Sequence, residues 1–164
     1  KGFNYGNSPF QYMNDQVLGK TLVLSTTNGT KAINMANHHT VIIASYINFT
    51  AVINFMQKQN RNIIILCSGW KGFFNMEDSI FAGKLSHQLL NNTSYLETNC
   101  DSVLASQALY KQSKSNLFEY LKNSSHRLRL QHLNMEKDTR FCLSPSLKSS
   151  IVPILNGKEL VELK

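Results

Sequence analysis

Residues 63–66 read Ile-Ile-Ile-Leu, four branched apolar side chains in a row with no polar residue among them. Successive side chains of a strand point to opposite faces of its sheet, so a run without alternation predicts a strand covered on both faces. Two other strand-like runs precede it, and each of the three is followed by a segment with helical spacing. The predicted pairs are strand 21–25 with helix 31–37, strand 41–45 with helix 49–59, and strand 62–67 with helix 76–90. We therefore expect an α/β fold, a three-layer α/β/α arrangement around a mixed, largely parallel sheet.

The second half of the chain predicts mainly helices. Their expected ranges are 101–112, a helix from Ser113 or Ser115 to 121, and a helix that begins at Ser125. Residues 140–143 are a candidate strand. Residues 152–155 and 159–163 flank Asn156-Gly157, a dipeptide typical of a tight hairpin turn. No linker or repeat interrupts the pattern, so residues 1–164 are expected to form a single α/β domain.

Composition and charge argue against two classes of partner. The chain is 42% apolar and 16% charged, with a formal net charge of +7. Its 17 basic residues are spread singly, which disfavours a nucleic-acid surface and suits the attraction of a small anion. No apolar run approaches the ~20 residues that cross a bilayer, so no membrane span is expected. Three scattered cysteines without metal-ligand spacing predict reduced thiols in a cytoplasm.

A polar turn, Ser-Thr-Thr-Asn-Gly-Thr, separates the first predicted strand from its helix at residues 25–30. The carboxyl end of a strand is where open α/β sheets bind ligands, and free N–H groups at a helix start attract anions. Gly29 would let the backbone approach such a ligand closely. The candidate anion-binding residues are Thr26, Thr27, Asn28, Gly29 and Thr30. The alternative is an ordinary capped turn.

The third predicted strand is followed by a glycine-containing loop, Ser68-Gly69-Trp70-Lys71-Gly72. This loop is expected to open on the same edge of the sheet as the polar turn. Lys71 could act there as a point charge for phosphate or sulfonate, or it could be a solvated loop lysine.

Two adjacent carboxylates, Glu77 and Asp78, follow a stretch from residue 16 to residue 76 that contains no acidic side chain. Carboxylates are preferred ligands of Mg²⁺, although adjacent helical residues point about 100° apart and are not expected to grip one ion alike. Asn75 is a predicted helix cap, and Asp78 stands where a capping-box acceptor can reach back. The pair therefore predicts either a metal site or a helix start that complements the dipole.

Several motifs together resemble the 2-phosphosulfolactate phosphatase family. They occur in the expected order and cover nearly all of the chain: Gly2-Phe3-Asn4-Tyr5-Gly6-Asn7-Ser8-Pro9, Thr26-Thr27-Asn28-Gly29-Thr30, Cys67-Ser68-Gly69-Trp70-Lys71-Gly72, Met76-Glu77-Asp78, Ala82-Gly83, Asp101-Ser102, Ser125-His126 and Phe141-Cys142. The ordered set is specific, although no single motif is diagnostic.

The resemblance implies a cytoplasmic α/β enzyme that uses Mg²⁺ to hydrolyse a phosphate monoester of a sulfonated lactate, on the path to coenzyme M. It places Glu77 and Asp78 in the metal site and Lys71 beside the substrate, so these three are the expected catalytic residues. The expected substrate-binding residues are Asn7, Ser8, Thr26, Thr27, Asn28, Gly29, Thr30, Gly69 and Gly72. The expected partner is a small anionic phosphoester.

One family feature has no counterpart in these 164 residues. The resemblance implies a preceding segment with a strand and an Asp-x-x-Arg-Ala motif, whose arginine or metal ligand would otherwise be missing. We therefore expect that the chain is the larger, C-terminal part of such a phosphatase, and that a separate chain or a homo-oligomer completes it. The contrasting hypothesis is an eroded relative that binds anions without catalysis.

Overall fold

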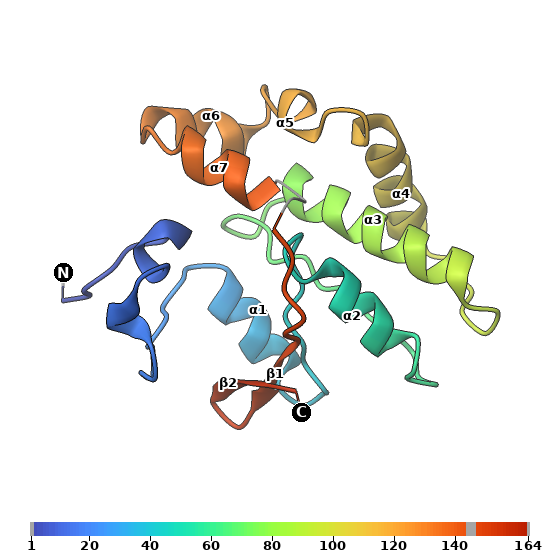
Figure 1. The fold of residues 1–164 in the computed structure, drawn as a ribbon. Coiled ribbons are helices and arrows are strands. Elements are labelled where there is room, and N and C mark those ends of the chain that lie inside the picture. Colours follow the sequence, from blue (N-terminus) through green and yellow to red (C-terminus); the bar gives the residue numbers. More distant parts are fainter. Residues whose placement is uncertain (1, 144–146, 164) are drawn as a thin grey trace.

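The computed structural model describes residues 2–143 and 147–163, with α6 and α7 at one end of the molecule and a β-hairpin at the other (Figure 1). Its elements, in chain order, are the 3-10 helices η1 (Pro9–Tyr12) and η2 (Asp15–Val17), the helices α1 (Gly29–Ala36), α2 (Phe49–Met56), α3 (Met76–Asn92), α4 (Asp101–Ser113), α5 (Leu117–Tyr120), α6 (Ser125–His132) and α7 (Glu136–Leu143), and the strands β1 (Pro153–Asn156) and β2 (Glu159–Glu162). The described chain is thus a mixed α/β structure in which helices predominate.

The central pair of helices is α3 and α4, which lie side by side (Figure 1). The predicted cap of α3 is confirmed, because the Asn75 side chain accepts a hydrogen bond of 2.8 Å from the Glu77 N–H. Gly83 lies at the crossing, where an added Cβ would stand 1.9 Å from the carbonyl oxygen of Ser106 on α4. The two backbones can approach so closely only because residue 83 has no side chain.

The main core lies between α2, α3 and the C-terminal segment. Its buried members are Val52, Ile53, Met56, Leu85, Leu89 and Val152. Asn48, only 6% exposed, hydrogen-bonds to the backbone of two distant segments of the chain. Its side chain accepts from the Ser45 N–H at 2.8 Å and donates to the carbonyl oxygens of Ile43 and Ile151 at 2.9 and 3.2 Å. A buried amide is stable here because its polar groups are satisfied.

The predicted C-terminal hairpin is confirmed. Strands β1 and β2 pair antiparallel around Asn156-Gly157, where Gly157 takes a φ of +61°. The predicted strand 41–45 lies beside β1, through an isolated bridge between Ile42 and Ile154. This pairing is antiparallel, and the backbone hydrogen bonds between residues 41–43 and 153–155 are 2.9 Å long. The neighbour of residues 41–45 is therefore the distant hairpin rather than one of the other two strands of the predicted parallel sheet.

The two other predicted strands of the sheet have no paired neighbour in the part of the chain that the structure describes. Residues 22–24 carry exposed Leu, Val and Leu side chains, with Val23 78% exposed. In segment 62–67, Ile63 and Ile65 contact the core, whereas Ile64 is 84% exposed. This segment is thus covered on one face rather than two, and the predicted three-layer sheet is not observed among these residues. A strand needs a neighbour, and its local sequence does not specify one.

The predicted strand 140–143 is wrong, because these residues end α7. Thr139 and Leu143 are buried four positions apart on one helical face, and Arg140 bonds Glu136 one turn earlier at 2.8 Å. The helices predicted after Asp101 and Ser125 are confirmed, and α5 occupies only the end of the range predicted for the helix between them. No helix in residues 2–143 and 147–163 is both long and apolar enough to cross a bilayer.

Candidate functional site

The polar turn at residues 25–30 leads into α1, which begins two residues before the predicted start. The Thr26 hydroxyl oxygen accepts a hydrogen bond of 3.1 Å from the Thr30 N–H, and the Thr30 hydroxyl donates to the Thr26 carbonyl oxygen. Thr26 and Thr30 thus hydrogen-bond to each other across the turn, which agrees with the alternative of a capped turn. The Thr30 N–H is therefore occupied within the turn, and the anion-binding role of residues 26–30 stays a prediction.

The glycine-containing loop turns back sharply before α3. Trp70 and Phe73 exchange two backbone hydrogen bonds of 3.0 and 3.1 Å, and the intervening Lys71 and Gly72 both have positive φ, at 53° and 82°. Two positive φ values at the centre of a turn are characteristic of type I′. Gly69 has a φ of +64°, and a Cβ there would stand 2.6 Å from the Phe73 carbonyl oxygen. This loop conformation therefore requires glycine at position 69.

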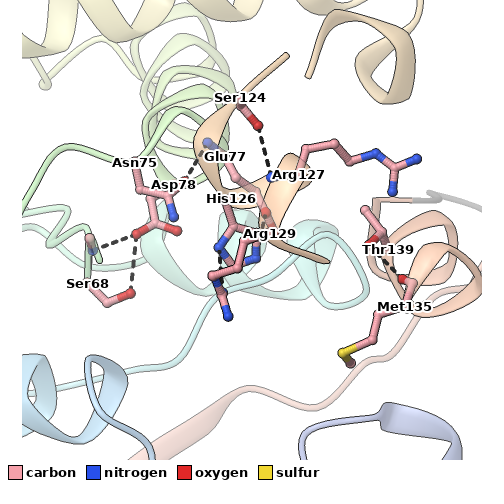
Figure 2. Close-up of polar contacts among 11 residues, drawn as sticks. Ser68, Asn75, Glu77, Asp78, Ser124, His126, Arg127, Arg129, Met135 and Thr139 are labelled. Carbon is pink, nitrogen blue, oxygen red and sulfur yellow. Dashed lines mark hydrogen bonds and ion pairs between the residues drawn. The ribbon is translucent and has the colours of Figure 1, made fainter. Parts of the chain in front are cut away.

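Three hydrogen bonds join this loop to the polar turn and to α3. The Lys71 N–H donates to Asn28 Oδ1 at 3.0 Å. On the other side of the loop, Asp78 Oδ2 accepts from the Gly69 N–H at 2.7 Å and from the Ser68 hydroxyl at 3.2 Å (Figure 2). The polar turn, the loop and the start of α3 therefore lie together. Lys71 is exposed, and its ammonium lies 4.7 Å from the centre of the Trp70 ring.

The two carboxylates at the start of α3 have different neighbours. The prediction that Asp78 closes a capping box is wrong, because its carboxylate is directed to the loop. Glu77 instead faces α6, with its Oε2 3.7 Å from Nε2 of His126. Burial, and secondarily the negative charge of Asp78, raises the pKa of Glu77. The side chains of Glu77 and Asp78 therefore point in different directions, as adjacent positions on one helix require.

The carboxylate oxygens of Glu77 and Asp78 are suitable ligands for a hard cation that keeps several of its water molecules. Within the described residues, no three or more His, Cys, Asp and Glu side chains are arranged to hold a metal. The hydrogen bonds and the ion pair described above involve Oδ2 of Asp78 and Oε2 of Glu77, and none recorded in residues 2–143 and 147–163 reaches the other carboxylate oxygen of either residue. Mg²⁺ commonly takes only one or two protein carboxylates and completes its shell with water and substrate oxygens. The residues present therefore fit Mg²⁺.

The predicted site residues near the N-terminus, Asn7 and Ser8, come directly before η1. Ser8 caps η1, which begins at Pro9. Next to it, the Phe10 ring packs against Phe141 of α7 at a centroid distance of 4.9 Å. Beyond its own N-terminal segment, η1 thus contacts α7, and no recorded hydrogen bond links Asn7 or Ser8 to the polar turn within the described residues.

In the sequence, His126 stands out only through the Ser125-His126 motif and Arg129 does not stand out, whereas the structure brings the two side chains together. Arg129 Nη2 lies 3.2 Å from His126 Nδ1 (Figure 2). The Arg129 guanidinium also lies 5.4 Å from the centre of the Trp70 ring. Burial, and secondarily the charge of Arg129, lowers the pKa of His126. The available signal was the i, i+3 spacing of His126 and Arg129, which places both on one helical face.

A pocket of about 180 Å³ opens beside this cluster. Aromatic side chains of the loop form one wall, and Ser125, His126 and Arg129 of α6 form another. Asn75, the cap of α3, also lines it. Trp70 therefore belongs both to the pocket and to the loop that Asp78 holds. His126 lines the pocket and is also the residue that Glu77 faces.

Comparison with known proteins supplies further findings. The family model described as 2-phosphosulpholactate phosphatase matches residues 1–158. A "Probable 2-phosphosulfolactate phosphatase" of Thermotoga petrophila is 35% identical over 157 residues, which cover 96% of this chain and 66% of that protein. Proteins with the same description from Caldanaerobacter subterraneus subsp. tengcongensis and Gloeothece citriformis are 35% and 37% identical, over 93% and 87% of this chain and 66% and 60% of theirs. The chain thus spans less than two thirds of the length of these relatives.

Proposed function

This chain belongs to the 2-phosphosulpholactate phosphatase family, and on that premise we propose that it hydrolyses the phosphate monoester of a small anionic acid. The proposed reaction converts 2-phosphosulfolactate, or a closely similar ester, to sulfolactate and phosphate. The proposal draws its substrate class from the described activity of relatives about 35% identical over most of the chain.

One structural observation supports particular residues as the site of this reaction. The hydrogen bond from the Lys71 N–H to Asn28 joins the glycine-containing loop to the polar turn, while Asp78 holds the other end of the same loop. A helix start, an ammonium group and a carboxylate pair thus belong to one connected assembly. Such an assembly can bind a phosphoryl group and position it, and positioning accounts for much of phosphoryl-transfer catalysis.

The proposed reaction transfers the phosphoryl group to water. The water oxygen bonds to phosphorus as the ester P–O bond breaks, and a water proton ends on the departing alkoxide, which becomes the hydroxyl of the acid. Gly29 opens α1, whose N–H groups and dipole favour negative charge at that end. Lys71 adds a point charge beside it. Asp78 would help to hold the loop that carries Lys71, since it accepts hydrogen bonds from Ser68 and Gly69.

We propose Mg²⁺ as the cofactor, held by Asp78 and Glu77. When bound, the ion would neutralise charge on the phosphoryl oxygens. Asp78 would combine this role with holding the loop, since one of its oxygens already accepts from Ser68 and Gly69.

Phosphate release from 2-phosphosulfolactate tests the function directly, with and without Mg²⁺. The full-length Thermotoga petrophila relative serves as the assay control. Wild-type chain should release phosphate with Mg²⁺ and lose activity in EDTA. Replacing Asp78 by Asn should lower kcat/KM about 100-fold, because loop placement and charge are both affected. Asn28→Ala should lower it about tenfold, whereas Asn60→Ala, an exposed asparagine after α2, should leave it unchanged. Full activity in Asp78→Asn would contradict the assignment.

A second candidate, a non-catalytic anion-binding module, is favoured by one observation. Arg129 lines the pocket, and its Nε is buried without a recorded hydrogen-bond partner among the described residues, so its positive charge can attract an anion whether or not hydrolysis follows. Calorimetry with inorganic phosphate separates the two functions. Phosphate binding without hydrolysis, in a chain whose relative is active under the same conditions, would support the binding module.

We also propose that segments 21–25 and 62–67 belong to the largely parallel sheet of a three-layer α/β/α fold. The alternating burial of residues 63–66 supports a strand in this segment, and the proposed fold would place its second helical layer on the face that Ile64 exposes. Hydrogen exchange tests the proposal. Slow exchange of the amides of residues 63–66 is expected if they are paired in solution, and exchange at the rate of an unstructured peptide would contradict it.

A further inference from the structure

The pocket between the loop and α6 contains an arginine whose charge is not balanced by a carboxylate. Arg129 has no acidic partner within salt-bridge distance in residues 2–143 and 147–163, and its Nε is buried without a hydrogen-bond acceptor. Among the described residues, only its Nη2 has a recorded hydrogen-bond partner, the Nδ1 of His126. Arg140 differs, since its guanidinium stacks on Phe118 but also bonds Glu136 at 2.7 Å. A partly desolvated guanidinium without an anion is costly, and binding an anion would offset that cost.

His126 keeps Arg129 apart from the nearest carboxylate. A guanidinium can only donate hydrogen bonds, so the Nδ1 atom that it contacts must be the acceptor. The ring proton then belongs on Nε2, which faces the Glu77 carboxylate at 3.7 Å. The imidazole is thus placed between the two charges, oriented by both. This arrangement leaves the remaining donors of Arg129 available to a ligand.

The wall opposite α6 is aromatic and suits the carbon skeleton of a small acid. Trp70 lies at a distance of 5.4 Å from the Arg129 guanidinium and belongs to the loop that carries Lys71. A volume of about 180 Å³ accommodates a few heavy atoms rather than a nucleotide or a peptide. Guanidinium groups bind planar or tetrahedral oxyanions through two parallel N–H donors. Ser125 and Asn75 provide further polar groups in the lining.

We propose that this pocket binds the second oxyanion of a doubly anionic substrate, a carboxylate or sulfonate, through Arg129, with Trp70 against its carbon atoms. The inference rests on the proposed function for its substrate class and adds a residue that distinguishes such substrates from simple phosphate esters. Arg129 is thereby a specificity residue, and His126 is the positioning residue that orients it.

Binding can be measured without turnover because Trp70 is the only tryptophan in the chain. Sulfoacetate is a suitable probe, since it carries a carboxylate and a sulfonate but no phosphate to hydrolyse. Titration at constant ionic strength should produce a saturable change in Trp70 fluorescence. Arg129→Gln should raise the Kd at least about tenfold, and Arg129→Lys should recover part of the affinity, because it keeps the charge and loses the paired donors.

Arg61→Gln is the matched control, since Arg61 is exposed after α2 and does not line the pocket. It should bind sulfoacetate like the wild type. Thermal midpoints of all variants check that they are folded. Absence of a saturable signal in the wild type, or wild-type affinity in folded Arg129→Gln, would overturn the proposal.

A kinetic experiment separates this inference from the proposed function. With 2-phosphosulfolactate, Arg129→Gln should raise KM at least about tenfold and change kcat much less, because Arg129 contacts the part of the substrate that does not react. With p-nitrophenyl phosphate, which has no second oxyanion, KM should be unchanged. An equal loss on both substrates would overturn the specificity role. If no ester is hydrolysed but the sulfoacetate result holds, the phosphatase proposal fails and the oxyanion site stands.

Discussion

The helices after residue 75 and the extended segments before residue 68 differ in how well other parts of the chain cover their apolar side chains and pair with their backbone. Helices α3 and α4 pack so closely that Gly83 contacts the opposite backbone, and Leu85 is 1% exposed. In the extended segments, apolar side chains such as Val23 and Ile64 remain largely in solvent. A helix satisfies its backbone hydrogen bonds internally, whereas a strand depends on another segment. Five predictions test whether this contrast holds in solution.

Substitution at the α3–α4 crossing is expected to have the largest effect. Gly83→Val places branched carbons where a Cβ already stands 1.9 Å from the Ser106 carbonyl oxygen, so the helices must separate. We expect a loss of more than about 3 kcal/mol in the free energy of unfolding, measured with urea. Asn91→Val adds the same side chain at an exposed position of α3 and should cost less than about 1 kcal/mol. Similar losses for both variants would contradict close packing at residue 83.

The second-largest loss of stability is expected from truncating Leu85, a core side chain of α3. Leu85→Ala removes a side chain that is 1% exposed and leaves a cavity, with an expected cost of about 3 kcal/mol in urea unfolding. Leu104→Ala on α4, where the side chain is 53% exposed, is the control and should cost less than about 1 kcal/mol. If the two variants were equally stable, α3 would not be the centre of the core.

Asn48 tests the junction between the two regions. Asn48→Ala leaves the Ser45 N–H and the carbonyl oxygens of Ile43 and Ile151 without their partner, at an expected cost of about 2 kcal/mol. Asn54→Ala, an exposed asparagine on the same helix, should be close to neutral. Wild-type urea stability of Asn48→Ala would show that segment 41–45 is not held by this side chain.

His126 predicts a pH dependence within the helical region. Burial lowers its pKa in the folded protein below the ordinary 6.5, so protonation favours the unfolded chain. Its contribution to stability is present above pH 6.5 and is lost as the pH falls through the lower folded-state pKa. Glu77 acts in the opposite sense, because its raised pKa favours protonation in the folded state.

His126→Asn should therefore flatten the fall of the urea midpoint as the pH is lowered from 7. His132→Asn, an exposed histidine at the end of α6, serves as the control and should retain the wild-type profile. A profile for His126→Asn that is identical to the wild type would rule out this contribution.

The smallest effect is expected in the extended region. Ile64 is 84% exposed, so Ile64→Ser should change the free energy of unfolding by less than about 0.5 kcal/mol in urea. Ile65, which contacts the core, provides the comparison and should lose clearly more on the same substitution. A loss above about 2 kcal/mol for Ile64→Ser would mean that this face is covered in solution, and the contrast between the two regions would disappear.

The helix starts were predictable because their signals are local. Asn75 caps α3 through the Glu77 N–H, and Asp101 and Ser125 begin helices as expected. The turn at Asn156-Gly157 was predictable for the same reason. The error at residues 140–143 arose because a short apolar stretch fits a strand or the end of a helix equally well, and its place one turn after Glu136 decided for the helix.

For the candidate site, sequence reasoning identified the polar turn, the glycine-containing loop and the two carboxylates. It could not assign their bonds, because Asn28 and Lys71 meet only through the folding of the intervening chain. The capping role predicted for Asp78 failed since the loop backbone offered its carboxylate a competing donor, the Gly69 N–H. His126 and Arg129 were missed because their neighbours, Glu77 and Trp70, are far from them in sequence.

The sequence by itself determined where α2, α3, α4 and α6 begin, where the C-terminal hairpin turns and which family the chain resembles. All three depend on residue types at short spacing, whose effects act within a turn or two of backbone. Only the tertiary structure decided which segment pairs with residues 41–45, which carboxylate holds the loop, and that Arg129 faces Trp70. These contacts join distant segments, and they form only where packing brings both partners to the same place.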